Sequence, residues 1–213
     1  LRALRRDPPP RGLAARPKID PRLALAERLV AERNCRGCHA FDERPGDVAR
    51  FYADAALTPP PLAGEGARVQ PGWLFSFLLD PSPLRPWLEL RMPTFGFSEP
   101  EAEALVAWFG AQAGRTGPYN RAHRPPSDPG RAALGEALLS DLKCRSCHVL
   151  GGASTADLAP DLGLARERLD ARWIRRFLED PDAVLPGTRM PQFFPGGTSP
   201  QPAILGGVAA DQM

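Results

Sequence analysis

The chain contains the stretch Asn34-Cys35-Arg36-Gly37-Cys38-His39, and a near copy follows as Lys143-Cys144-Arg145-Ser146-Cys147-His148. Each copy reads C-x-x-C-H, and together the two copies use all four cysteines and two of the three histidines in the 213 residues. One copy is a moderate signal. Two copies that account for every cysteine are a strong one, and the rest of the chain is organised around them.

The spacing within each copy fits the covalent attachment of a c-type haem. Two thiols three positions apart on a helical turn can each reach one vinyl group of a porphyrin, and the next residue then offers an imidazole nitrogen to the iron. A zinc site is the main alternative, but its second ligand pair must lie near the first, and 106 residues separate Cys38 from Cys144. A thioredoxin-like redox pair needs a βαβ context, whereas the flanks here have a helical pattern.

On these motifs the chain resembles the dihaem cytochromes c, which consist of two class I cytochrome c domains in tandem. The resemblance implies an all-α fold of short helices and long loops around two haem c groups, each holding one iron. It also implies the site residues, with cysteines as attachment points and histidines as proximal iron ligands: Cys35, Cys38, His39, Cys144, Cys147 and His148.

Sequence blocks around the two motifs recur in the same order. A helix that begins with Asp-Pro runs into each motif, a block that begins with Trp and ends with Asp-Pro follows it, and an Arg-Met-Pro triplet comes last. These blocks are Asp20-Pro21 and Asp128-Pro129, residues 73–81 and 173–181, and residues 91–93 and 189–191. Asp at the N-cap with Pro after it starts a helix. A Pro also disfavours helical geometry in the residue before it, so the later Asp-Pro pairs end one.

The triplets supply the predicted distal iron ligands, Met92 and Met190. Since only His123 remains beyond the proximal pair, the two irons cannot both take a second histidine from this chain. A thioether is a good ligand for haem iron, while the alternative is a methionine that fills core space. We expect His123 to be solvated, with iron ligation as the alternative, and Met213 to have no role at the iron.

Other side chains have two roles open. The tryptophans that begin these blocks, Trp73 and Trp173, suit either a haem edge or ordinary core packing. Arginines next to the motifs and triplets suit either haem propionates or solvent: Arg36, Arg91, Arg145 and Arg189.

The pattern predicts four segments: an Arg- and Pro-rich arm at 1–19, a cytochrome c domain at 20–112, a linker at 113–127 and a second cytochrome c domain at 128–213. In the first domain, Ser98 and Glu101 form a capping box that starts a C-terminal helix. No matching helix is evident after Met190. We therefore expect the apolar face of the helix around Gly135 to be covered by chain beyond this sequence or by another subunit.

Composition adds few constraints. The formal net charge of +2 gives no indication of nucleic-acid binding. No run of 18 apolar residues predicts a membrane span, and residues 1–13 lack the apolar region of a signal peptide, so the sequence reads as a mature or trimmed product. Because the family acquires its haems outside the cytoplasmic membrane, we expect a periplasmic or extracellular protein, with membrane association only through a partner.

The resemblance implies one-electron transfer between redox partner proteins rather than enzymatic activity. One alternative is a dihaem enzyme, similar to the bacterial dihaem peroxidases or thiosulfate dehydrogenases, which requires an exchangeable distal position and nearby acid or base groups. The other is a haem-bearing subunit of a respiratory or multi-haem assembly, or a homo-oligomer.

Overall fold

The computed structural model of the chain describes residues 20–42, 44–115, 117–119, 128–150 and 158–213. The predicted arm at 1–19 and His123 lie outside these residues. Within them the regular structure is helical, and extended segments meet only as isolated bridges, so the predicted all-α class is confirmed. None of the described helices is both long enough and apolar enough to cross a membrane.

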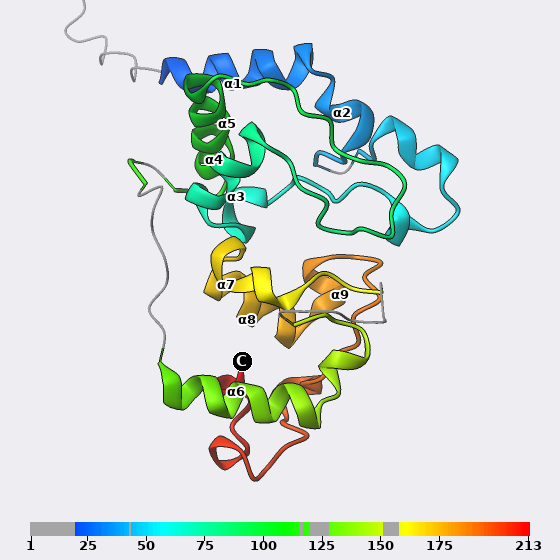
Figure 1. The fold of residues 1–213 in the computed structure, drawn as a ribbon, viewed down its shortest axis with the longest axis vertical. Helices are drawn as coiled ribbons and strands as arrows, with labels where there is room; N and C mark the ends of the chain where they lie inside the picture. Colours follow the sequence, from blue (N-terminus) through cyan, green and yellow to red (C-terminus); the bar gives the residue numbers. More distant parts are fainter. Residues whose placement is uncertain (1–19, 43, 116, 120–127, 151–157) are drawn as a thin grey trace, which may run out of the picture.

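The first half of the molecule, residues 20–119, runs from blue to green in Figure 1. Its helices are α1 (Pro21–Glu32), α2 (Cys35–Cys38), η1 (Asp47–Phe51), η2 (Ala55–Leu57), α3 (Glu65–Arg68), α4 (Pro71–Leu79) and α5 (Glu99–Gln112). The predicted caps are present, because the Asp20 carboxylate accepts the N–H of Arg22 and Ser98 forms a capping box with Glu101. The longest helix, α5, packs against α1, α3 and α4, and Ala26 is fully buried in that core.

The second half, residues 128–213, contains α6 (Pro129–Asp141), η3 (Cys144–Ser146), η4 (Leu162–Leu164), α7 (Ala165–Arg168), α8 (Ala171–Glu179), α9 (Pro181–Val184), η5 (Pro195–Gly197), η6 (Leu205–Gly207) and α10 (Ala209–Gln212). Asp128 caps α6 as predicted, by accepting the N–H groups of Gly130 and Arg131. The single turn of α10 is the only α-helix in residues 191–213, so no long counterpart of α5 lies in the described second half. Asp211 lies inside α10, whose N-cap is Val208.

Short helices of the two halves correspond at an offset of 100 residues. By this offset α3 matches α7 and α4 matches α8, and both longer helices end at the predicted Asp-Pro pairs, with Asp80 and Asp180 as C-caps. The repeat found in the sequence is therefore also a repeat of helices.

The two halves meet through these matched elements, near the middle of Figure 1. The chain at residues 68–70 pairs antiparallel with the chain at residues 168–170, and we call this contact the inter-half ladder. The N–H of Gln70 donates to the Arg168 carbonyl at 2.8 Å, and the N–H of Asp170 donates to the Arg68 carbonyl at 2.9 Å. Around the ladder α3 contacts α8 and α4 contacts α7. Equivalent residues thus pair with each other, as in a contact with two-fold symmetry.

Candidate functional site

Each C-x-x-C-H motif lies on its own short turn rather than on the preceding helix. We predicted that these helices run into the first cysteines, and that was wrong. Helix α1 ends at Glu32 and α6 ends at Asp141, and in both cases a residue with positive φ follows, Asn34 at 50° and Lys143 at 57°. A left-handed residue ends an α-helix, so each motif starts a new turn at an angle to the helix before it.

The new turn brings the histidine back over the first cysteine. The N–H of His39 donates to the Cys35 carbonyl at 2.9 Å, and the N–H of His148 donates to the Cys144 carbonyl at 3.0 Å. In the first half a close approach fixes this turn further, because a Cβ on Gly46 would lie only 2.4 Å from the Cys38 carbonyl oxygen. Only glycine allows the segment before η1 to lie against the motif backbone.

The two histidine rings make the same hydrogen bond in the two halves. Nδ1 of His39 lies 2.8 Å from the Pro60 carbonyl oxygen, and Nδ1 of His148 lies 2.7 Å from that of Pro160. Because a carbonyl only accepts, Nδ1 must carry the proton, which leaves the lone pair of Nε2 free as a metal ligand. The two prolines are also 100 residues apart, so the repeat includes the group that orients each ring.

Burial favours the neutral forms of titratable side chains in the two motifs. It lowers the pKa of His39, so the ring stays unprotonated at neutral pH and can bind a metal. It also raises the pKa of the Cys35 and Cys144 thiols, while Cys147 is exposed. Neutral thiols are poor ligands for a bare metal ion. No cluster of three or more His, Cys, Asp or Glu side chains suited to a metal ion occurs in the part of the chain that the structure describes.

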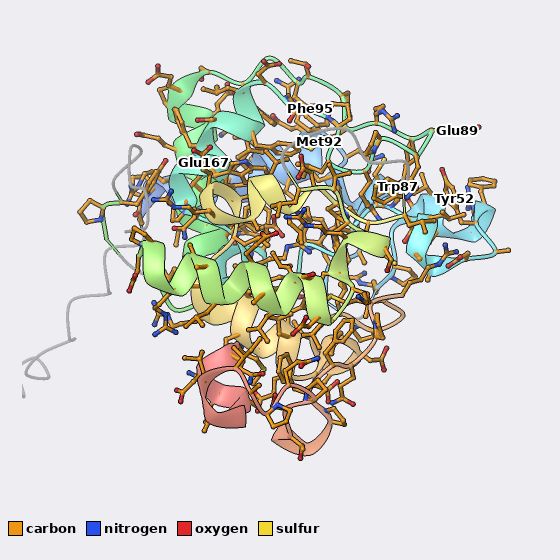
Figure 2. All side chains as sticks on the ribbon, turned by 60° about the horizontal axis from the view of Figure 1, so that its bottom comes forward. Tyr52, Trp87, Glu89, Met92, Phe95 and Glu167 are labelled. Atoms are coloured by element: carbon orange, nitrogen blue, oxygen red, sulfur yellow. The ribbon has the colours of Figure 1, made fainter. Side chains whose placement is uncertain are left out.

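The predicted distal methionines each lie in a loop of the same half as their histidine. Met92 is half-buried against the first-half core, in the long loop between α4 and α5 that also carries Trp87 and Phe95 (Figure 2). Met190 is half-buried in the loop after α9, where its N–H donates to the Thr188 hydroxyl. Met213 is elsewhere, beside α6 in a small hollow.

The structure assigns protein contacts to the side chains whose roles were open. Trp73 stacks on Phe77 with centroids 4.7 Å apart, and Trp173 stacks on Phe177 at 4.8 Å. The four arginines also contact protein groups: Arg36 the Phe41 ring, Arg91 the Pro86 carbonyl, Arg145 the Glu136 carboxylate and Arg189 the Asp54 carboxylate. Gly135, the small residue of α6, has no atom within 4 Å of a Cβ placed on it.

Sequence reasoning missed a group of buried and half-buried charges beside the inter-half ladder. We call it the arginine cluster: Glu65, Arg68, Arg85 and Arg168. Burial, and then the charge of Arg68, lowers the pKa of Arg168 to about 10. The available signal was the offset of 100 residues, which Arg68 and Arg168 share with the tryptophan blocks.

No protein-family model, no curated protein and no solved structure matches this chain. Within the described residues, the site is therefore defined by its own geometry. An all-helical chain presents the same turn of two cysteines and one carbonyl-anchored histidine twice.

Proposed function

We propose that this chain is a dihaem cytochrome c with two tandem domains, and that it relays single electrons between redox partners outside the cytoplasmic membrane. The observation that carries the proposal is the matched pair of hydrogen bonds from Nδ1 of His39 to Pro60 and from Nδ1 of His148 to Pro160. A histidine that only packs in a core has no reason to hold the same tautomer, after the same Cys-x-x-Cys turn, twice in one chain.

The residues around the motifs fit a covalent haem. The thiols of each pair lie one turn apart and are kept neutral where burial raises their pKa, and the oriented imidazole follows directly. When bound, the haem supplies an iron that cycles between ferrous and ferric states. The two cysteines of each motif would hold the haem, and the Pro60 and Pro160 carbonyls orient the imidazoles that would bind its iron.

Met92 and Met190 complete the proposed sites as distal ligands. Their loops lie within the same half as the histidine each would oppose, and both side chains are half-buried. Iron held by both a histidine and a thioether has no free position for a substrate, which favours a carrier over a peroxidase-like or thiosulfate dehydrogenase-like enzyme.

The proposal is tested by producing the chain in a host that attaches haem to exported proteins. Mass spectrometry should find two haems, and the reduced protein should show a c-type alpha band. Cys35→Ala with Cys38→Ala should remove one haem, and Cys144→Ala with Cys147→Ala the other.

A bare polypeptide from that host would refute the proposal. Carbon monoxide binding to the untreated reduced protein, together with rapid peroxide turnover, would instead replace the carrier by the enzyme.

A further inference from the structure

The arginine cluster carries more positive than negative charge; its members Glu65 and Arg68 are buried, and Arg85 and Arg168 are half-buried. Arg68 is 8 % exposed and Glu65 is 6 % exposed, and the two form an ion pair rather than a well-aligned hydrogen bond. Arg85 and Arg168 lie within electrostatic range of Arg68. The four groups carry three positive charges and one negative charge, and at the buried pair of Arg68 and Glu65 an uncompensated charge is costly.

Two donors of the cluster have no acceptor. The Nε atoms of Arg68 and Arg168 are buried and make no hydrogen bond. The guanidinium of Arg168, which comes from the second half, lies 5.3 Å from the centroid of the Trp73 ring in the first half. Buried donors are nearly always paired in folded proteins, so two guanidinium groups, one from each half, are incompletely paired with protein acceptors.

The cluster adjoins the first motif. Arg85 donates to the carbonyls of Ala56 at 3.1 Å and Thr58 at 2.7 Å, in the segment that leads to Pro60, the acceptor for His39. Burial lowers the pKa of His39, the Pro60 hydrogen bond and the charge of Glu65 raise it, and the charges of Arg68 and Arg85 lower it further. The contacts of Arg85 therefore connect the cluster to the first motif.

We propose that Arg68, Arg85 and Arg168 form a carboxylate-binding site shared by the two halves, and that its ligands are the propionate groups of the haem on Cys35 and Cys38. This inference rests on the proposed function. Guanidinium groups bind carboxylates through paired, charge-assisted hydrogen bonds. Two propionates together with Glu65 balance the three guanidinium charges.

The shared site makes the first haem depend on the second half. A positive charge held next to a haem favours the ferrous state, because reduction removes one positive charge from the iron. Arg168 therefore raises the reduction potential of the first haem, although it lies on the far side of the inter-half ladder.

The test compares Arg168→Gln with Arg172→Gln in the intact chain with both haems. Arg172 is a matched control, since it lies four residues further on and its side chain is 90 % exposed. The potential of each haem is followed by NMR of its methyl signals, which are assigned through the thioether bonds to each cysteine pair.

We expect Arg168→Gln to lower the ferrous-to-ferric ratio of the first haem about ten-fold at a fixed potential, equivalent to about 59 mV. Arg168→Lys should restore most of the shift, and Arg172→Gln should leave the ratio unchanged. Equal effects of Arg168→Gln and Arg172→Gln in a protein with both haems would overturn this inference alone. A chain without haem on Cys35 and Cys38 would overturn the proposed function as well.

A measurement on the unmodified protein applies even if Arg168→Gln fails to fold. The charged and titratable groups around the proposed site are His39, Glu65, Arg68, Arg85 and Arg168. Propionates paired with arginine stay ionised, so the potential of the first haem should be constant between about pH 5 and pH 7.5. A potential that falls with rising pH in this range would show a free propionate and contradict the shared site.

Discussion

A single proton decides what each motif histidine can do. The carbonyl of Pro60 fixes that proton of His39 on Nδ1, and burial keeps the ring neutral by lowering its pKa. The same acceptor is provided to His148 by Pro160. The motifs and the histidines were evident in the sequence, but the acceptors were not, because nothing local marks a proline carbonyl 12 or 21 residues away as a partner.

Met92 is the residue whose role can be tested most directly. In the proposed dihaem protein, we expect Met92→Ala to keep both haems but to remove the methionine-to-iron charge-transfer band of one oxidised haem and to lower its potential, since thioether ligation raises it. Met213→Ala is the matched control and should change neither. An unchanged spectrum in Met92→Ala would show that Met92 only fills space between the loop and the core.

At the scale of elements, one glycine sets the distance between two helices of the first half. A Cβ on Gly66 in α3 would lie 1.9 Å from the Phe109 carbonyl oxygen in α5. Gly66→Ala should therefore lower the free energy of unfolding by about 1–3 kcal/mol, the usual effect of overpacking.

The matched control for this change is Gly135→Ala in α6. It meets no atom within 4 Å, and alanine in a helix interior is favoured over glycine by about 0.5–1 kcal/mol. Denaturant titration should thus move the two midpoints in opposite directions. Destabilisation of similar size in Gly135→Ala would mean that α6 is covered by a close neighbour, as the sequence led us to expect.

The cap of α5 gives the molecule one predictable dependence on pH. Hydrogen bonds from the backbone and hydroxyl of Ser98 lower the pKa of Glu101. A carboxyl whose pKa is lowered by folding stabilises the protein above its unfolded value, and that stabilisation disappears as the pH falls through the folded value.

Glu101→Gln should therefore be less stable than the unmodified chain at pH 7, and the difference should vanish in acid. Denaturation midpoints at several pH values measure this, with Glu27→Gln, an exposed change in α1 outside the cap, as the control. A difference that persists unchanged into acid would show that the carboxylate charge has no part in the cap.

The features predicted correctly from the sequence are those that depend on residues close together in the chain. The caps at Asp20, Asp128 and Ser98 were predicted because an N-cap and its helix are neighbours in the chain. The break before each cysteine pair was missed. Asn34 is a residue type that accepts positive φ at the end of a helix, whereas Lys143 gives no such signal. The predicted roles of Met92 and Met190 stay predictions.

At the scale of the whole molecule, the repeated segments also contact each other, which the sequence comparison did not predict. Blocks 100 residues apart indicated equivalent helices, but equivalence alone does not say that equivalent segments touch. The inter-half ladder depends on tertiary pairing between residues 68–70 and 168–170, and the paired segments are too short to show alternation. The arginine cluster was missed for the same reason, since an arginine becomes unusual only when it is buried.

Asp170 has two roles, since it caps a helix of its own half and also pairs with an arginine of the other half. Its carboxylate caps α8 by accepting from the N–H groups of Arg172 and Trp173, and it also accepts from Arg115 of the first half at 2.6 Å. Asp128 caps α6 in the same way but has no such partner among the interactions described for it.

Asp170→Ala should cost about 1 kcal/mol for the cap and about 1–3 kcal/mol more for the lost bond to Arg115, whereas Asp128→Ala should cost only the first amount. Hydrogen exchange separates the two effects, because the amides of Gln70 and Asp170 close the inter-half ladder. Both should exchange faster in Asp170→Ala and at the original rate in Asp128→Ala. If their protection survives in Asp170→Ala, the halves are held together by contacts other than the Arg115–Asp170 pair, and the arginine cluster with its proposed propionates becomes the main candidate.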